Sequence, residues 1–266
     1  GVMGGLEVQV AVLGDDPSAP GQAAALALLA ESLRAAGVPE APEIMRLPDE
    51  VALADLPVDA DGLPVLGLAD DTLAPTGFPD AGVFLVCGPP RSGRTTTLRS
   101  IAASVRRARP HAALAYFGSR TSPLISSVDW DFAAGTEDEA AELAGALLDK
   151  AMTEPIDPTS LVVVIEGIGD FVSSPADMPL QRLVKACRTH DQLVVAEGET
   201  STLSGSWPLL QAVKASRCGI ALQPDLLDGD TVFRTSFPRV TRAEFPEGRG
   251  LRVVGGRVTR VQVALP

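Results

Sequence analysis

The segment Gly88-Pro-Pro-Arg-Ser-Gly-Arg-Thr95 has the residue types and the spacing of a phosphate-binding loop. Two glycines frame four residues, and a basic residue and a threonine follow, which is the form G-x-x-x-x-G-[basic]-[Ser/Thr]. In such a loop successive backbone N–H groups surround phosphate oxygens, and the start of the next helix adds the positive end of its dipole. The candidate nucleotide-binding residues are Gly88, Arg91, Ser92, Gly93, Arg94, Thr95 and Thr96.

Within this loop, Arg94 and Thr95 have separate predicted roles. Arg94 would face the β- and γ-phosphates, and the Thr95 hydroxyl would bind Mg²⁺, so ATP and Mg²⁺ are the predicted ligands. The motif has lysine where this chain has Arg94. A guanidinium is bulkier and planar, so it binds phosphate without reaching the same transition-state geometry. Nucleotide binding therefore survives this change more easily than hydrolysis does.

A nucleotide-hydrolysing site also needs an acid at the end of a central strand. The apolar run Leu161 to Ile165 leads directly into Glu166, which is the candidate catalytic residue and, with Thr95, the candidate magnesium ligand. The next position, where a second acid often polarises the attacking water, is Gly167. Asp170 is the nearest substitute in the sequence. The lack of an acid at position 167 again predicts weak hydrolysis.

Two more acids, Glu197 and Glu199, follow the next apolar strand. Parallel sheets bind ligands at the carboxyl ends of their strands, so both acids are expected at the same edge as the loop. A role in the site and simple solvation in a loop both remain open for them.

Other catalytic chemistries find little support in the sequence. The two histidines, His111 and His190, are isolated, which argues against a Ser-His-Asp triad or a metal cluster and favours surface or helix-end positions. The three cysteines, Cys87, Cys187 and Cys218, lie in apolar stretches and are interpreted as core residues. A reducing, cytoplasmic compartment fits this usage.

The loop is predicted to lie between a buried strand and an amphipathic helix. Val83 to Cys87 is wholly apolar, as in a strand buried on both faces of a parallel sheet, and apolar residues at helical spacing follow the loop. Strands then alternate with helical patterns to residue 222, which predicts βαβ units: an α/β fold with a mainly parallel sheet and helices on both faces. The further predicted strands are Ala112 to Phe117, Leu161 to Ile165, Leu193 to Ala196 and Cys218 to Leu222. Gly255-Gly256 predicts a C-terminal β-hairpin.

Residues 1–62 differ from the rest of the chain. Leu6 to Leu13 alternates as a strand does, Leu26 to Leu33 carries a helical apolar stripe, and Pro39 to Pro64 has the composition of a linker or a loosely packed wrap. We therefore expect an N-terminal part, 1–62, and a nucleotide-binding domain, 63–266. The first strand also resembles Gly256 to Leu265, which indicates either chance or the tail of a preceding tandem module.

The charge of the chain restricts its partners. The formal net charge is −12, which argues against a general nucleic-acid surface. Residues 217–260 nevertheless hold eight arginines, which form either a solvated face or an anion-binding or subunit-facing surface. No apolar run reaches the roughly 20 residues of a membrane span, and the N-terminus lacks a signal-peptide pattern, so contact with a membrane is expected only through other parts of a longer polypeptide.

With these motifs in view, the chain resembles the FtsK/SpoIIIE ATPases, and most closely the third ATPase module of the type VII secretion ATPase (EccC/EssC-like). The resemblance rests on Gly88 to Thr96, Glu166 to Asp170, Gly67 to Phe78 and Phe245 to Leu251. It implies a RecA-like P-loop fold, tandem modules in one membrane-anchored polypeptide, and ring assembly. For the secretion branch it also implies recognition of small helical secreted proteins.

The same resemblance gives Arg217, ahead of the last core strand, the role of a subunit-facing arginine. Arg94 and Gly167 both depart from an active family member. The leading hypothesis is an ATP-binding module with weak or absent hydrolysis that serves regulation or substrate docking. An active protein-translocating ATPase and an FtsK-type DNA translocase are the alternatives.

Overall fold

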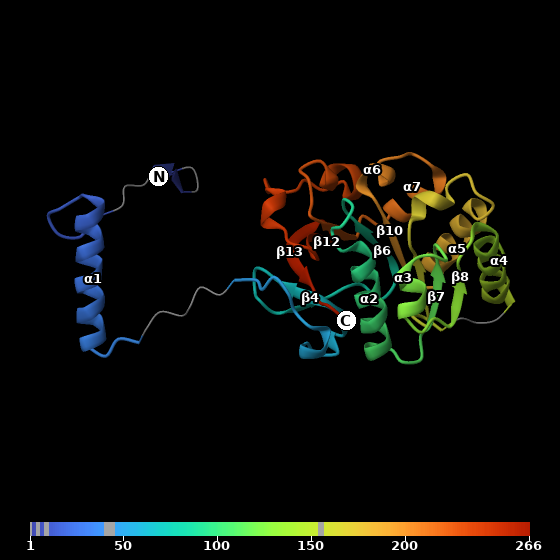
Figure 1. Ribbon diagram of the computed structural model, residues 1–266, viewed down its shortest axis with the longest axis horizontal. Helices are drawn as coiled ribbons and strands as arrows, with labels where there is room; N and C mark the ends of the chain where they lie inside the picture. Colours follow the sequence, from blue (N-terminus) through green and yellow to red (C-terminus); the bar gives the residue numbers. More distant parts are fainter. Residues whose placement is uncertain (1, 4–5, 8–10, 40–45, 154–156) are drawn as a thin grey trace. The chain divides into compact units, whose positions relative to one another are not determined.

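The computed structural model describes residues 2–3, 6–7, 11–39, 46–153 and 157–266 (Figure 1). The chain divides into two compact units, Gly1–Met45 and Arg46–Pro266. In the first unit, strand β1 (Val2–Met3) pairs antiparallel with β2 (Leu6–Glu7). The predicted strand from Leu6 to Leu13 is therefore seen only at its start, because residues 8–10 lie outside the described part and 11–13 are not in a strand.

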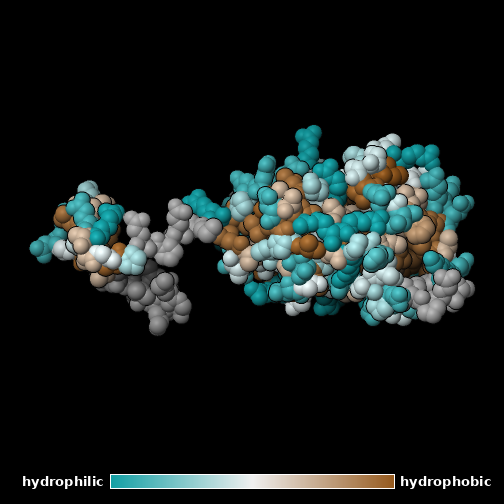
Figure 2. All heavy atoms as spheres, turned by 90° about the horizontal axis from the view of Figure 1, so that it is seen from below, coloured by the Kyte–Doolittle hydropathy of each residue, from teal (hydrophilic) through white to brown (hydrophobic). Residues whose placement is uncertain are grey.

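Helix α1 (Ala19–Ala35) begins and ends at the expected signals. The Ser18 hydroxyl accepts a hydrogen bond from the Gly21 N–H, and Gly37 has a positive φ of +72°, which favours glycine after a helix. None of the residues of this helix is buried. Leu26, Leu29 and Leu33 of the predicted apolar stripe are exposed, and Figure 2 shows hydrophobic as well as hydrophilic residues at the surface of this unit.

The second unit is built on a mixed sheet whose central part is parallel. The parallel strands are β6 (Gly82–Cys87), β7 (Ala113–Phe117), β8 (Phe132–Ala134), β9 (Leu161–Ile165), β10 (Leu193–Gly198) and β11 (Gly219–Leu222). Their order in space is β8-β7-β9-β10-β6-β11. This confirms the predicted α/β fold with a mainly parallel sheet.

The C-terminal β-hairpin extends this sheet with antiparallel strands. Strand β12 (Arg249–Val254) pairs with β11 and with β13 (Arg257–Val263). Strand β13 pairs in turn with β4 (Leu63–Ala69). Strand β4 also pairs with β3 (Asp59–Ala60) and β5 (Pro75–Gly77). The sequence analysis predicted the hairpin and missed β4, whose Pro64 and Gly67 are atypical of strands.

Helices cover both faces of the sheet (Figure 1). On one face pack α2 (Arg94–Ala108) and α3 (Pro123–Ser127), and on the other α4 (Glu137–Thr153), α5 (Asp177–Thr189) and α7 (Pro208–Lys214). Alternate residues of each strand face opposite sides of the sheet. Phe84 and Val86 face the side covered by α2, whereas Val83 and Leu85 face the side covered by α4, α5 and α7. Burial on both faces explains why these strands are continuous apolar runs.

The segment directly after residue 45 packs onto the sheet unit. Leu53 and Leu56 are buried, the Leu53 N–H donates to the Leu265 carbonyl over 2.6 Å, and Arg107 donates to the Leu53 and Leu56 carbonyls. The compact unit therefore begins at Arg46, not at residue 63, where we expected the domain to start. Residues 40–45 of the predicted linker lie outside the described part. No described helix has both the length and the hydrophobicity to cross a membrane.

Candidate nucleotide site

The order of the strands brings the separate motifs together. Strands β9, β10 and β6 are neighbours and parallel, so their carboxyl ends meet at one edge of the sheet. Glu166 directly follows β9, Glu197 lies near the end of β10, and the loop from Gly88 follows β6. The predicted site residues from three distant parts of the chain are therefore adjacent.

The loop from Gly88 to Thr95 is closely packed against the C-terminal part of the chain. A Cβ on Gly88 would lie 2.7 Å from the Leu222 carbonyl oxygen, and Gly93 has φ +94° with Gly248 N 3.1 Å from the place of its missing Cβ. The Ser92 carbonyl accepts a hydrogen bond from the Gly248 N–H over 3.1 Å. These contacts fix the backbone of the loop from outside.

The inner side of the loop has free backbone donors. Helix α2 begins at Arg94, so the N–H groups of its first turn have no partner within the helix. Arg91, in the middle of the loop, has φ +65°, and such alternation of backbone conformation turns successive N–H groups toward one point. This backbone therefore fits a phosphate group.

The side chain of Arg94 is already engaged. Its Nε lies 2.9 Å from Glu197 Oε1, its Nη2 lies 3.5 Å from Glu199 Oε1, and its Nη1 donates to the Gly88 carbonyl over 3.0 Å. Two carboxylates thus surround one guanidinium, and the local charge of this group is negative. The Arg94 guanidinium can therefore bind a phosphate only after it has left these partners.

Glu197 is the most buried member of this group, with 6% of its side chain exposed. Burial raises the pKa of its carboxyl above the ordinary value, and the Gly167 N–H and the charge of Arg94 offset part of that effect. The Gly167 N–H donates to Glu197 Oε2 over 2.8 Å. Glu197 therefore links the loop to the end of β9, so it is not a solvated loop residue.

Glu166 receives hydrogen bonds on both of its oxygens. The Thr95 hydroxyl donates to Oε1 over 3.1 Å, and the Tyr116 hydroxyl donates to Oε2 over 2.6 Å. Burial, followed by the bond to Glu166, raises the pKa of Tyr116. The two predicted magnesium ligands are thus in direct contact. Sequence reasoning missed Tyr116, although its place near the end of β7, beside β9, was the available signal.

Gly167 and Asp170 lie much closer together than their separation in sequence indicates. Gly167 has φ +64°, and a tight 3-10 turn over Ile168–Phe171 folds Asp170 back, so that its Oδ2 lies 2.8 Å from the place where a Cβ on Gly167 would be. A carboxylate therefore occupies this region without an acid at position 167. Asp170 and Glu166 both line a cavity of about 640 Å³.

A second cavity, of about 410 Å³, adjoins the other side of the loop. Its lining residues are Asp49, Glu50, Gly93, Thr96, Thr97, Pro246, Glu247, Gly248, Gln262, Val263, Ala264 and Leu265. Gly93, Thr96 and Thr97 belong to the loop and the first turn of α2, so a ligand on the loop has room to extend here. Of these residues the sequence analysis predicted a nucleotide-binding role only for Gly93 and Thr96.

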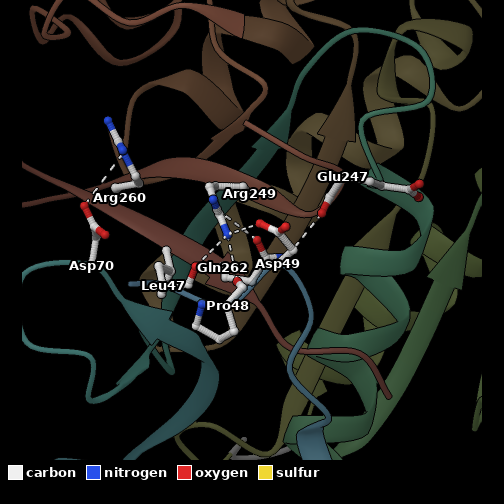
Figure 3. A network of polar contacts seen from close by, with 8 residues as sticks. All are labelled: Leu47, Pro48, Asp49, Asp70, Glu247, Arg249, Arg260 and Gln262. Atoms are coloured by element: carbon white, nitrogen blue, oxygen red, sulfur yellow. Dashed lines mark hydrogen bonds and ion pairs between the residues drawn. The ribbon is translucent and has the colours of Figure 1, made fainter. Parts of the chain in front are cut away.

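Arg249 fixes the rim of this second cavity (Figure 3). Its Nη2 donates to the carbonyls of Leu47 and Pro48, over 3.1 and 2.7 Å, and to Asp49 Oδ1 over 2.9 Å, while its Nε donates to Gln262 Oε1 over 3.1 Å. One arginine thus ties the segment before β3 to both strands of the C-terminal hairpin. For Arg249 the interpretation as a solvated face is wrong, because only 9% of the residue is exposed.

Apart from Cys87, which directly precedes Gly88, the remaining singled-out residues lie away from the loop. Arg217 precedes β11 and therefore lies toward the amino ends of the parallel strands, whereas the loop lies at their carboxyl ends. His111 is exposed, and His190 is exposed at the C-cap of α5. Cys87 and Cys187 are buried as expected, and Cys218 is partly buried.

No protein-family model and no curated protein sequence matches the chain. Solved structures do. The cytoplasmic domain of the Thermomonospora curvata type VII secretion ATPase EccC aligns over 96% of this chain and 32% of its own length, with a TM-score of 0.69 and 21% identity. EccC ATPases 2 and 3 from the same organism, in complex with a signal sequence peptide, give a TM-score of 0.68 at 21% identity over 96% of this chain and 50% of theirs.

EssC ATPases 2 and 3 from Geobacillus thermodenitrificans align over 94% of this chain and 51% of their own, with a TM-score of 0.65 and 18% identity. The chain thus spans about a third of the first of these structures and about half of the other two. The fold is that of the ATPase modules of EccC and EssC, as the sequence resemblance predicted.

Proposed function

We propose that the second unit is an ATP-binding module of a type VII protein secretion ATPase of the FtsK/SpoIIIE kind, with weak or absent hydrolysis, that serves regulation or substrate docking. The fold supports an ATPase-module role in secretion. The observation that carries the proposal of weak hydrolysis is the ion pairing of Arg94 with Glu197 and Glu199 beside an otherwise suitable loop.

The residues present fit a nucleotide in three places. The loop amides would hold the phosphates, Thr95 and Glu166 would hold Mg²⁺, and the cavity beside Thr96 has room for the nucleoside. Magnesium supplies the positive charge that neutralises the β- and γ-phosphates. Ser92, Gly93 and Arg91 act here through their backbone, because they shape the loop.

Arg94 limits turnover because its charge is already neutralised. A guanidinium that stabilises the transition state must meet charge as it develops on the phosphate. In this chain the approaching triphosphate meets two carboxylates and one guanidinium, so the electrostatic balance opposes tight engagement. Gly167 provides no carboxylate of its own to polarise water.

The test is a titration with ATP and Mg²⁺ together with a hydrolysis assay. We expect saturable binding that weakens in Thr95→Ala, and release of phosphate by the unmodified protein at a rate near background. Rapid Mg²⁺-dependent turnover would overturn the proposal of a degenerate site, and absence of nucleotide binding under all conditions would overturn nucleotide recognition itself.

An active ATPase is the second candidate, and the position of Asp170 favours it. Because Asp170 lies against Gly167, its carboxylate is close to where an acid at position 167 would begin. Should turnover be observed, Asp170→Asn would test whether Asp170 supports it. A loss of hydrolysis with unchanged ATP affinity assigns the water-polarising role to Asp170, and an unchanged rate excludes it.

A DNA translocase of the same family is disfavoured by the net charge of −12. A duplex-binding assay across a salt series checks this point, since tight and steeply salt-dependent binding would reverse the ranking.

One EccC structure contains a signal sequence peptide, which supports small helical secreted proteins as partners. The proposed partners also include other ATPase modules of the same polypeptide or ring. The proposed location is the cytoplasmic side of a membrane-anchored complex, and the proposed role of Arg217 is to face a neighbouring subunit.

A further inference from the structure

A third cavity of the second unit, of about 320 Å³, lies apart from the nucleotide loop. Its walls come from the end of α7, the turn that leads into β11, and the π-helix Gly229–Phe233 with its C-cap. The lining residues are Gln211, Lys214, Ala215, Arg217, Thr231, Val232 and Arg234. Three of these seven residues are cations and none is an acid.

The backbone fixes the Lys214 side chain and sets the conformation of the two arginine residues. The Lys214 ammonium donates to the carbonyls of Leu203 and Gly205, over 2.6 and 2.8 Å, which fixes its direction. Arg217 and Arg234 each have φ +51°, a left-handed conformation that non-glycine residues seldom adopt. The Arg217 N–H donates to the Lys214 carbonyl over 3.1 Å, so these two residues belong to one local turn.

No carboxylate of the described residues forms an ion pair with this group. Among the described residues, none of the ion pairs involves Lys214, Arg217 or Arg234, although other arginines of the same C-terminal series are paired with Asp49, Asp70, Asp71 or Glu244. Burial, and then the positive charge of Arg234, lowers the pKa of Lys214. In a chain with a net charge of −12, an unneutralised group of like charges is a local exception.

We propose that Lys214, Arg217 and Arg234 form a site for a multiply charged phosphate anion, separate from the nucleotide loop. Two guanidinium groups match the oxygens of a phosphate in pairs, and the ammonium adds a third, compact charge. A phosphate with two or more negative charges balances three cations better than a single carboxylate does. The inference does not depend on nucleotide binding at the loop, and it needs no second subunit.

The experiment uses the full ¹⁵N-labelled chain, titrated with inorganic pyrophosphate and followed by NMR. The titration is done in the unmodified protein and in Thr95→Ala, so that responses at the loop and at the third cavity are separated. We expect saturable shifts at the backbone amides of Ala215, Arg217, Thr231 and Arg234 in both proteins. Shifts at the cavity alone would support this inference and oppose phosphate binding at the loop. Shifts at the loop alone would support phosphate binding at the loop and overturn this inference.

The test variant is Arg217→Gln with Arg234→Gln, because both residues are exposed. We expect its affinity for pyrophosphate at the cavity to fall at least about tenfold. Arg182→Gln with Arg188→Gln removes the same charge from exposed positions on α5 and should change the affinity less than about twofold. Equal losses of affinity in both variants would mean that only the net charge of the protein matters, and would overturn the proposed site.

Two further outcomes also oppose the proposal. Tighter binding of malonate than of pyrophosphate would assign the cavity to carboxylates. Binding that appears only when the protein self-associates, as measured by sedimentation in the same titration, would leave Arg217 with the subunit-facing role proposed above and would overturn a phosphate site within a single chain.

Discussion

Arg94 shows how one residue can keep a binding loop and change what the loop does. Its backbone lies at the start of α2, where the first-turn N–H groups remain available to an anion. Its side chain instead bonds to Glu197, Glu199 and the Gly88 carbonyl. A lysine has one compact charge and could not make these three contacts from one planar group. The change from lysine to arginine therefore acts together with the two acids.

The burial of Glu197 leads to a prediction about pH. Because its folded pKa is raised above the unfolded value of 4.5, the folded state takes up this proton first as the pH falls. The resulting stabilisation is full below 4.5 and is lost as the pH rises through the raised folded pKa. Relative to Glu197→Gln, the unmodified protein should therefore gain thermal stability between about pH 7.5 and about pH 5.

Thermal unfolding of both proteins at the two pH values measures this difference. Glu139→Gln is the opposite-sign control, because the Gly135 N–H lowers the pKa of Glu139, so that its contribution is present above 4.5 and is lost as the pH falls through the folded pKa. A Tm difference for Glu197→Gln that does not change with pH would contradict the assigned burial of this carboxyl.

At the scale of elements, the C-terminal hairpin has two tasks. Strands β12 and β13 complete the sheet, and they also carry Arg249 and Gln262, which hold the segment from Leu47 to Asp49 at the rim of the cavity beside the loop (Figure 3). Residues more than 190 positions apart in the sequence thus form one wall.

We predict that Arg249→Ala releases this segment. The change leaves the Leu47 and Pro48 carbonyls and Gln262 without their donor, and the cost of losing such buried partners is about 2–4 kcal/mol. Urea unfolding measures the loss, and hydrogen exchange at residues 47–56 should become faster. Arg257→Ala, which removes a side chain that is 77% exposed and paired with Asp71, should cost less than about 1 kcal/mol. Equal costs would contradict the structural role of Arg249.

The parallel core could be predicted from the sequence because its strands are buried on both faces. Apolar runs such as Leu161 to Ile165 leave few alternatives, and the predicted ends of these strands lie within two residues of the observed ends. Strand β4 was not predicted, because it contains Pro64 and Gly67 and is held by pairing with β13 from the far end of the chain. No local pattern contains that pairing.

The residues of the site, like the strands of the core, could be predicted in part from the sequence. The loop, Glu166 and the common edge of the sheet follow from motif and topology. The ion pairs of Arg94, the bond from Tyr116 to Glu166 and the approach of Asp170 to Gly167 depend on which strands are neighbours and on one tight turn. Side-chain geometry of this kind has no signature in residue spacing.

At the scale of the whole molecule, the two units differ in what stabilises them. The unit from Arg46 contains the hydrophobic cores, including a small one formed by Leu53, Leu56, Val65 and Ala264. Helix α1 has no buried residue, so residues 11–39, as far as the structure describes the side chains of the first unit, have little apolar burial to stabilise them. The sheet unit should therefore fold without it.

Truncation tests this division. A chain of residues 46–266 should unfold at the same temperature as the full chain, whereas 63–266 loses Leu53, Leu56 and the acceptors of Arg107 and should unfold at a temperature lower by several degrees. Thermal unfolding monitored by circular dichroism makes the comparison. Equal stability of the two truncated chains would contradict the assignment of residues 46–62 to the sheet unit.

The central claim is that the loop binds nucleotide weakly because Glu197 and Glu199 hold Arg94. Calorimetric titration of the unmodified protein and of Glu197→Gln with Glu199→Gln, each with ATP and Mg²⁺, tests it most directly, with Glu31→Gln and Glu142→Gln as the charge-matched control. We predict that the double variant binds ATP about tenfold more tightly, because the released guanidinium gains a charge-assisted bond to phosphate, and that the control is unchanged. Equal or weaker binding by the double variant would contradict the account.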